Sequence, residues 1–253
     1  MINDYLGYPR NVDGVLIYPV KVLDWKEFEE YANKFLLYGE KFIKYRLKAS
    51  SDVKIFDLII SIVSSEVVNS NDEDCILLKK LERMFSIVLH KETKLMYDSK
   101  NKKWIINFDG GKIDRENYDI FRRNIMEMNL IHEPIIAPNE LSQKLLDDAI
   151  KSMNKGGGKV DLESMIVYVC TYAKISPKDF EHMTYYQLRA QFEMCQRIQY
   201  SDAIHLYRSQ GAKVEPLNIA EELSIHENPY SFDKLVKKVD KNKEEKTRKA
   251  LGG

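Results

Sequence analysis

The sequence lacks an excess of either charge and lacks any long apolar run. Its 253 residues include 39 basic and 39 acidic side chains, so the formal net charge is zero. Balanced charge argues against a chain-wide electrostatic field directed at nucleic acid or at a membrane surface. No window holds the ~18 consecutive apolar residues that indicate a transmembrane helix. We therefore expect no membrane partner.

Cysteine, proline and glycine are also scarce. The three cysteines, Cys75, Cys170 and Cys195, stand in apolar helical contexts, which favours buried thiols in a reducing compartment over disulfides. Residues 1–10 lack a basic start followed by an apolar run, so we expect no signal peptide. With 7 prolines and 11 glycines, little of the chain has the composition of a disordered segment. These features predict a folded cytoplasmic protein.

Apolar residues recur at helical spacing in most of residues 1–154. Asp24, Asp114 and Asn139 stand where N-caps of three helices are expected. Two further helices are predicted over residues 52–64 and over the stretch that ends at His90.

Two stretches of the same region show strand patterns instead. Residues 15–22 are rich in β-branched side chains and follow Asp13-Gly14, and Pro19 favours an edge strand or a bulge there. Residues 94–97 and 104–108 flank a short polar loop, which predicts a β-hairpin.

Residues 161–211 carry the clearest helical signals. Three residues in it are expected to cap successive helices: Asp161, Ser176 and Thr184. The second of these helices is a single turn that opens with Pro177. Gly211 is the expected end of the third helix, which is the longest. A short helix near residues 219–225 and a last helix from Ser231 follow.

The glycine-rich run Lys155-Gly156-Gly157-Gly158-Lys159 is the clearest linker. We therefore predict an α+β N-terminal domain at residues 1–154, a linker at 155–160, a helical domain at 161–239 and a polar basic tail at 240–253. The expected fold class is α+β and predominantly α-helical. Its N-terminal helices accompany a short β-hairpin, and its C-terminal part is all helical.

No motif indicates catalysis, a cofactor or a metal site. The run before Val160 lacks the preceding strand and the hydroxyl of a phosphate-binding loop. The five histidines are scattered without the paired spacing of zinc ligands. His182 and Cys195 could meet across a helix pair, but a core thiol near a surface histidine is the commoner arrangement. We predict a protein that is not an enzyme and has no catalytic, cofactor-binding or metal-binding residues.

A helix, a short turn and a helix also form the outline of a helix-turn-helix DNA reader. In that interpretation Gln187, Arg189 and Gln191 would face base edges. Acidic side chains close by would repel phosphates: Asp179, Glu181, Glu193 and Asp202. DNA binding is therefore an alternative of lower rank, and nucleic acid is not the expected partner.

Tyrosine and methionine gather in the helical part, where they suit an adaptable protein interface. The same side chains would serve equally at the rim of an intramolecular core. As contacts for a long partner helix with an apolar stripe we predict six residues: Tyr168, Tyr172, Met183, Tyr185, Tyr186 and Met194. Between Lys234 and Lys249, eight basic side chains face three acidic ones, which is typical of a solvated tail or of a docking arm for an acidic partner.

Three stretches resemble proteins that are encoded by tailed phages and prophages of low-GC Gram-positive bacteria. They are GYPRNVDGVLIYPVKVLDWKEFEEYANKFLL, the hairpin KLMYDSKNKKWIINFDGGKI, and LESMIVYVCTYAKISPKDFEHMTYYQLRAQF followed by YRSQGAKV. The shared motifs are loose hydrophobic patterns that span most of the chain.

The resemblance implies a tail assembly chaperone of the host cytoplasm. Such proteins are non-enzymatic, are absent from the finished particle, and bind the tape-measure protein while tail-tube subunits polymerise around it. A structural head, connector or tail component would share the pattern and is the first alternative. Association of the chain into a homo-oligomer is compatible with the sequence.

Overall fold

The computed structural model describes residues 2–48, 50, 52–69, 76–154, 160–221 and 223–227. The described helices are α1 (Ile2–Tyr5), α2 (Val22–Phe35), α3 (Glu40–Tyr45), α4 (Ile55–Asn69), α5 (Ile76–Leu89), α6 (Tyr118–Met128), α7 (Glu140–Asn154), α8 (Leu162–Ala173) and α9 (Tyr185–Ser209), with the 3₁₀ helices η1 (Pro177–Glu181) and η2 (Ser224–His226). The described strands are β1 (Arg10–Val12), β2 (Val15–Ile17), β3 (Thr93–Asp98), β4 (Lys103–Phe108) and β5 (Gly111–Asp114). The predicted α+β, predominantly helical class is confirmed.

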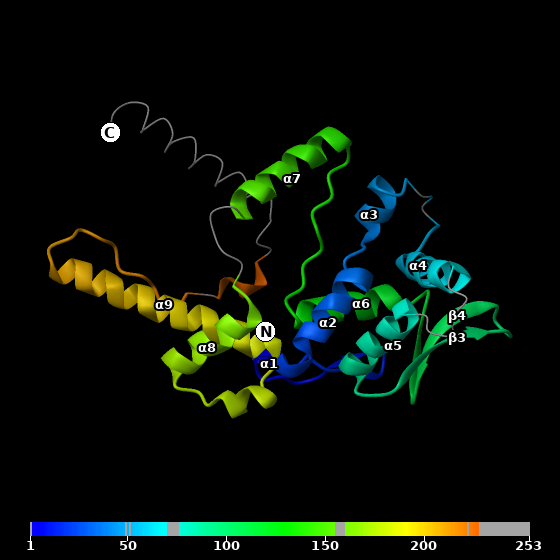
Figure 1. Ribbon diagram of the computed structural model, residues 1–253, viewed down its shortest axis with the longest axis horizontal. Coiled ribbons are helices and arrows are strands. Elements are labelled where there is room, and N and C mark those ends of the chain that lie inside the picture. The colour runs from blue at the N-terminus through cyan, green and yellow to red at the C-terminus, as the bar shows by residue number, and fades with distance from the viewer. Residues whose placement is uncertain are drawn as a thin grey trace.

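The elements form an elongated arrangement with α2 near its middle (Figure 1). The strands and α4, α5 and α6 lie on one side of α2, and α8 and α9 lie on the other. The main core is built from side chains of α2, α4, α5, α6 and the strands, with Phe28, Phe35, Phe85 and Phe121 fully buried. Among these rings Tyr118 is also fully buried, and its hydroxyl donates to the Phe35 carbonyl at 3.0 Å.

The predicted β-hairpin is confirmed as β3 and β4, which pair antiparallel from Thr93↔Phe108 to Asp98↔Lys103. A third strand, β5, extends this sheet beside β4 and was not predicted. The strand predicted over residues 15–22 is shorter, because β2 ends at Ile17 and pairs with the unpredicted β1. Asp13 and Gly14 form the two-residue turn between them with φ of +51° and +83°, the backbone that an Asp-Gly pair favours.

Four predicted N-caps are confirmed. The side chains of Asn139, Asp161, Ser176 and Thr184 accept hydrogen bonds from backbone N–H groups of the first turns of α7, α8, η1 and α9. Ser176 and Thr184 form full capping boxes, with Asp179 and Gln187 as the reciprocal partners. Gly211 follows α9 with φ of +88°, as expected for a residue that ends a helix.

Two predicted caps and one predicted helix are wrong. Asp24 lies inside α2, which begins at Val22. Asp114 belongs to β5 and its carboxylate accepts from the Glu116 N–H at 3.0 Å, so α6 begins after Asn117. Residues 219–221 form a turn and a bend rather than an α-helix, and residues 224 and 225 begin η2. The side chain of Glu193 accepts from the N–H of Ser224 at 2.8 Å.

Other predictions fall outside the described residues. These are the linker at 155–159, the helix from Ser231 and the tail at 240–253. The division into domains stays a prediction, and contacts of α9 and η1 with α1 and α2 connect its two parts.

An extended segment from Tyr18 to Val22 joins three regions of the molecule. The Tyr18 N–H donates to Val88 at the end of α5 at 2.7 Å, and the Val20 N–H donates to the side chain of Asn129 after α6 at 2.8 Å. The next alternate amide, that of Val22, donates to the Met183 carbonyl at 2.9 Å. Pro19, which has no N–H, occupies a position between these donors.

A short antiparallel bridge, Lys21↔Thr184, therefore ties the start of α2 to the start of α9. The Tyr185 N–H donates back to the Val20 carbonyl at 2.9 Å. Next to this bridge, the rings of Trp25 and Tyr185 stack with centroids 3.4 Å apart and planes 2° apart. The extended backbone of the bridge explains why α2 begins before Asp24.

We expect Trp25→Ala to lower the free energy of unfolding by about 3–5 kcal/mol, because it removes a buried ring from the contact between α2 and α9. Urea denaturation followed by circular dichroism measures the change. Leu23→Ala, at a neighbouring side chain that is 67% exposed, is the matched control and should change stability by about 0.5 kcal/mol or less. Equal effects of the two substitutions would contradict the role given to the ring stack.

Candidate protein-binding surface

Helices α8 and α9 lie side by side and run in the same direction. Met165 contacts Arg189, Tyr168 packs on Phe192 with ring centroids 5.1 Å apart, and Tyr172 binds Gln199, so the contacts advance together along both helices. Residues 174–184, which include η1, return the chain to the level where α8 began. Because α9 has 25 residues and α8 has 12, α9 continues well beyond the end of α8 (Figure 1).

The turn between the two helices is fixed by its own residues and by α2. Lys174 ends α8 in the left-handed region with φ of +55°. Phe180 of η1 is buried in a small core with Val22, Met165 and Leu188. The position of α9 beside α8 therefore depends on both the capping boxes and the contact with α2.

Two tyrosines of α8 are joined to α9 by one amide side chain. The Tyr168 hydroxyl donates to Gln199 Oε1 at 2.6 Å, and Gln199 Nε2 donates to the Tyr172 hydroxyl oxygen at 2.8 Å. The two tyrosine rings lie 4.7 Å apart. Burial raises the pKa of Tyr168, so its phenol stays protonated at neutral pH and keeps its role as the donor.

The structure separates the six predicted contact residues into different environments. Tyr168 and Tyr172 lie together on the side of α8 that borders α9, where Tyr172 is 46% exposed. Met194 and Tyr185 are half-buried, and Tyr185 is held by its stack on Trp25. Met183 and Tyr186 are buried in two different clusters. That all six contact a partner stays a prediction, but Met183 and Tyr186 are not at the surface.

Six large apolar side chains are exposed on α8 and α9, on more than one side of each helix, and we call this set the α8–α9 surface: Val167, Tyr172, Ile198, Tyr200, Leu206 and Tyr207. Only Tyr172 belongs to the predicted contact set. Tyr200 and Tyr207 are seven residues apart, so they point to one side of the part of α9 that extends beyond α8. The sequence carried this signal in that seven-residue spacing, but spacing does not reveal which side of a long helix stays uncovered.

The start of α9 is not arranged as a DNA-recognition helix. Gln187 closes the capping box with Thr184 and donates to the Tyr5 carbonyl at 2.8 Å. The side-chain amide oxygen of Gln191, Oε1, is buried. Arg189 is half-buried and contacts Met165 Sδ at 3.7 Å. Gln187 and Arg189 therefore contact other parts of the chain, and Gln191 Oε1 is buried without a hydrogen-bond partner among the described residues.

The described side chains do not form a nucleophilic pair from His182 and Cys195. His182 precedes α9, whereas Cys195 lies ten residues into it, a rise of about 15 Å. Cys195 is buried, and its burial raises the pKa of its thiol, which disfavours the reactive thiolate. Among the described residues, no group of three or more His, Cys, Asp and Glu side chains is placed to hold a metal ion.

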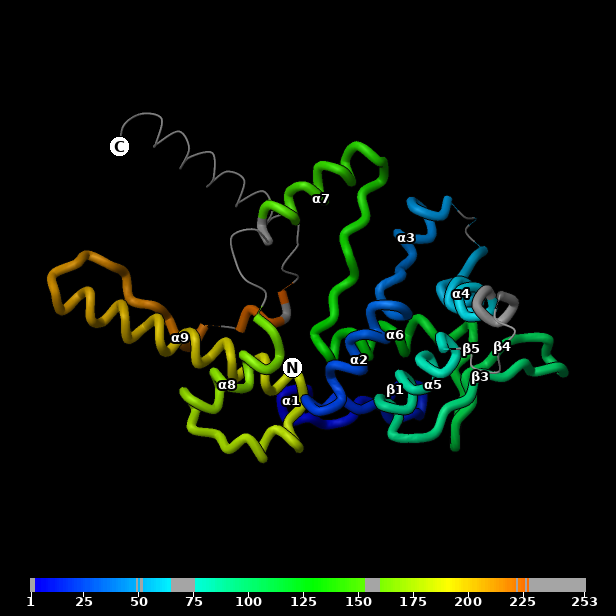
Figure 2. The backbone as a smooth tube through the Cα atoms, viewed as in Figure 1, coloured from blue at the N-terminus to red at the C-terminus, as the bar shows by residue number. Residues whose placement is uncertain are grey.

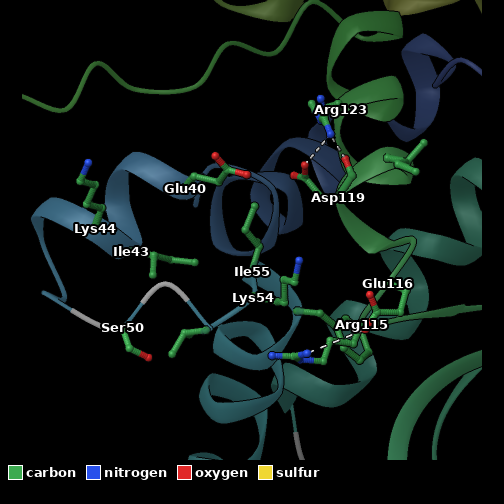
Figure 3. A pocket seen from close by; sticks show the side chains of 13 residues that line it. Glu40, Ile43, Lys44, Ser50, Lys54, Ile55, Arg115, Glu116, Asp119 and Arg123 are labelled. Carbon is green, nitrogen blue, oxygen red and sulfur yellow. Dashed lines mark hydrogen bonds and ion pairs between the residues drawn. The ribbon is translucent and has the colours of Figure 1, made fainter.

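A pocket of about 690 Å³ lies where α3 and the first turns of α4 and α6 meet (Figure 3). Two arginines at its wall are paired, Arg115 with Asp57 at 2.9 Å and Arg123 with Asp119 at 2.8 Å. Lys54 has no ion-pair partner within the described ranges. The lining of the pocket includes neither histidine nor cysteine, the usual members of a nucleophile–base pair. The charged side chains of its wall are lysine, arginine, glutamate and aspartate.

We expect iodoacetamide to alkylate Cys195 about tenfold or more slowly in the folded chain than in urea, because the thiol is buried and its pKa is raised. Mass spectrometry of the peptide that contains Cys195, after timed alkylation, measures both rates. Equal rates in the folded and the unfolded chain would show an accessible thiol and would restore the nucleophile interpretation.

The helical part of the chain is similar to a known family. Residues 151–221 match the family described as the YomV second domain, which is a phage-associated domain. No curated protein and no solved structure matches the chain. Within the described ranges, no helix combines the length and the apolar character needed to cross a bilayer. The matched segment contains α8, η1 and α9, so the α8–α9 surface lies in the part that indicates a phage protein.

Proposed function

We propose that this protein is a non-enzymatic tail assembly chaperone, which binds the tape-measure and tail-tube proteins of its phage in the host cytoplasm. The observation that carries the proposal is the α8–α9 surface inside the segment that resembles a phage-associated domain. Tyrosine and leucine side chains exposed on a helix suit contact with another apolar-striped helix.

The dimensions of α9 fit a long helical partner. Its 25 residues correspond to about 37 Å, or roughly seven turns, of helix. The exposed members of the surface are spread over both helices rather than collected in one deep pocket. Such a surface forms many shallow contacts and few deeply buried hot spots. This favours the reversible binding that a chaperone requires.

Co-expression tests this function directly. The chain is produced with the tape-measure and tail-tube proteins of the same genome, and the complexes and the purified particles are both analysed by mass spectrometry. Capture of the tape-measure protein, together with absence from particles, supports the chaperone role. Recovery inside particles at fixed stoichiometry would instead make the chain a structural component.

We expect the double substitution Tyr172→Ala, Leu206→Ala to raise the Kd for the tape-measure protein about tenfold or more, because it truncates two exposed apolar side chains of the α8–α9 surface. Titrated pull-down measures the Kd. Leu23→Ala is the matched control, because Leu23 is an equally exposed leucine on α2 outside the surface, and it should leave the Kd unchanged.

An unchanged Kd in the double variant would locate binding elsewhere and contradict the assignment of the surface. Salt provides a second criterion. Apolar contacts should respond little to salt, whereas binding to nucleic acid would weaken steeply as salt rises.

A further inference from the structure

A groove of about 470 Å³ lies between α2, the extended residues 130–136 and α7. Figure 2 shows the long connector that leads from α6 to α7. Half-buried apolar side chains from these segments line the groove: Leu37, Ile131, Ile135, Ile136 and Ile150. The stacked rings of Trp25 and Tyr185 also line it. The groove is distinct from the α8–α9 surface.

The ionised groups of the groove are carboxylates. Glu29, Glu133 and Asp147 line it, and the lining contains no lysine or arginine. Glu133 pairs with Arg122, and Asp147 accepts a hydrogen bond from Gln143 at 2.8 Å. Glu29 and Asp147 have no cationic partner in the part of the chain that the structure describes. A complementary occupant therefore combines apolar side chains with positive charge.

The described chain ends beside this groove. Ile225 is buried in a cluster with Tyr186 and Ala190, and Leu130, which lines the groove, packs against the same cluster. Four residues beyond Glu227 span up to about 14 Å when extended. The sequence that follows residue 231 is thus within reach of the groove.

That sequence has the required chemistry. Four apolar residues after Glu227 recur at the spacing of one helical face: Phe232, Leu235, Val236 and Val239. Eight basic and three acidic side chains lie between Lys234 and Lys249.

We propose that residues 231–249 bind in the groove of their own chain. The apolar side chains from Phe232 to Val239 contact Ile131 and Ile135, and the lysines lie beside Glu29 and Asp147. The binding buries apolar surface and places positive charge next to unpaired carboxylates. This intramolecular docking uses a different surface from the proposed chaperone function, and either can fail without the other.

Site-specific photocrosslinking in the full chain tests the docking. In the variant Phe232→p-benzoylphenylalanine, irradiation of the dilute protein should produce crosslinks within one chain to residues 130–136 and to α7, identified by mass spectrometry. Crosslinks between chains would show that a second copy covers the groove. Crosslinks to other surfaces, or none, would likewise overturn the proposal.

A matched pair of substitutions tests the specificity of the crosslink. Ile135→Lys adds a repelling charge inside the groove and should lower the crosslink yield about tenfold. Leu141→Lys changes an exposed side chain of α7 outside the groove lining and should leave the yield unchanged. Equal yields in these two variants would overturn the proposal.

The double substitution Leu235→Asp, Val236→Asp leaves every described residue intact, so it tests the docking even if Ile135→Lys disturbs folding. It should also lower the yield about tenfold, because it removes two apolar contacts and lowers the positive charge of the segment. An undiminished yield in this variant would refute the proposal.

Discussion

The backbone of residues 18–22 is the constraint on which the arrangement of the molecule depends. Its alternate N–H groups donate to three different regions, at the end of α5, after α6 and before α9. Because a buried backbone group without a partner is costly, this extended strip fixes the three regions together as firmly as a strand in a sheet. It also sets the start of α2, since Lys21 is held extended in the bridge to Thr184 and the helix can begin only at Val22. The capping potential of Asp24 is local and is outweighed by these long-range hydrogen bonds.

An ion pair between the buried Arg122 and the partly exposed Glu133 holds the connector that leads to α7. Arg122 of α6 is fully buried, and its guanidinium contacts Asp119 and Glu133, which lies on the connector. A Cβ atom at Gly39 would crowd the Glu133 carboxylate, so a larger residue there would require this side chain to shift. Loss of either carboxylate would leave the buried guanidinium with fewer anionic partners, which favours this geometry although both carboxylates are partly exposed. This pairing sets the position of Glu133, which is one of the carboxylates that line the groove between α2 and α7.

The outcome of the sequence predictions follows the range of the interactions that determine each feature. The caps at Asn139, Asp161, Ser176 and Thr184 depend on hydrogen bonds within three residues, and the sequence predicts them correctly. Strands β1 and β5 depend on pairing with neighbours, and neither has a strong apolar alternation of its own. The burial of Tyr186 and the exposure of Tyr200 also escape prediction, because both tyrosines lie on α9 and differ only in what packs against them. Tyr172 is 46% exposed although its hydroxyl accepts from Gln199 of α9, a combination that its place in the sequence does not reveal.

The two halves of α9 have different surroundings, and this difference suits a binding element. Its first half is enclosed by α1, α2 and α8, whereas its second half extends beyond α8 with Tyr200, Leu206 and Tyr207 exposed. The middle of the helix is held by Glu193, which pairs with Arg197 at 2.7 Å and accepts from the N–H of Ser224 on the returning chain at 2.8 Å. Arg197 also donates to the Glu221 carbonyl, so the returning chain is fastened to the helix at two points. The exposed side chains are therefore carried by an α-helix, and the binding that we propose for them would cost little conformational entropy of the backbone.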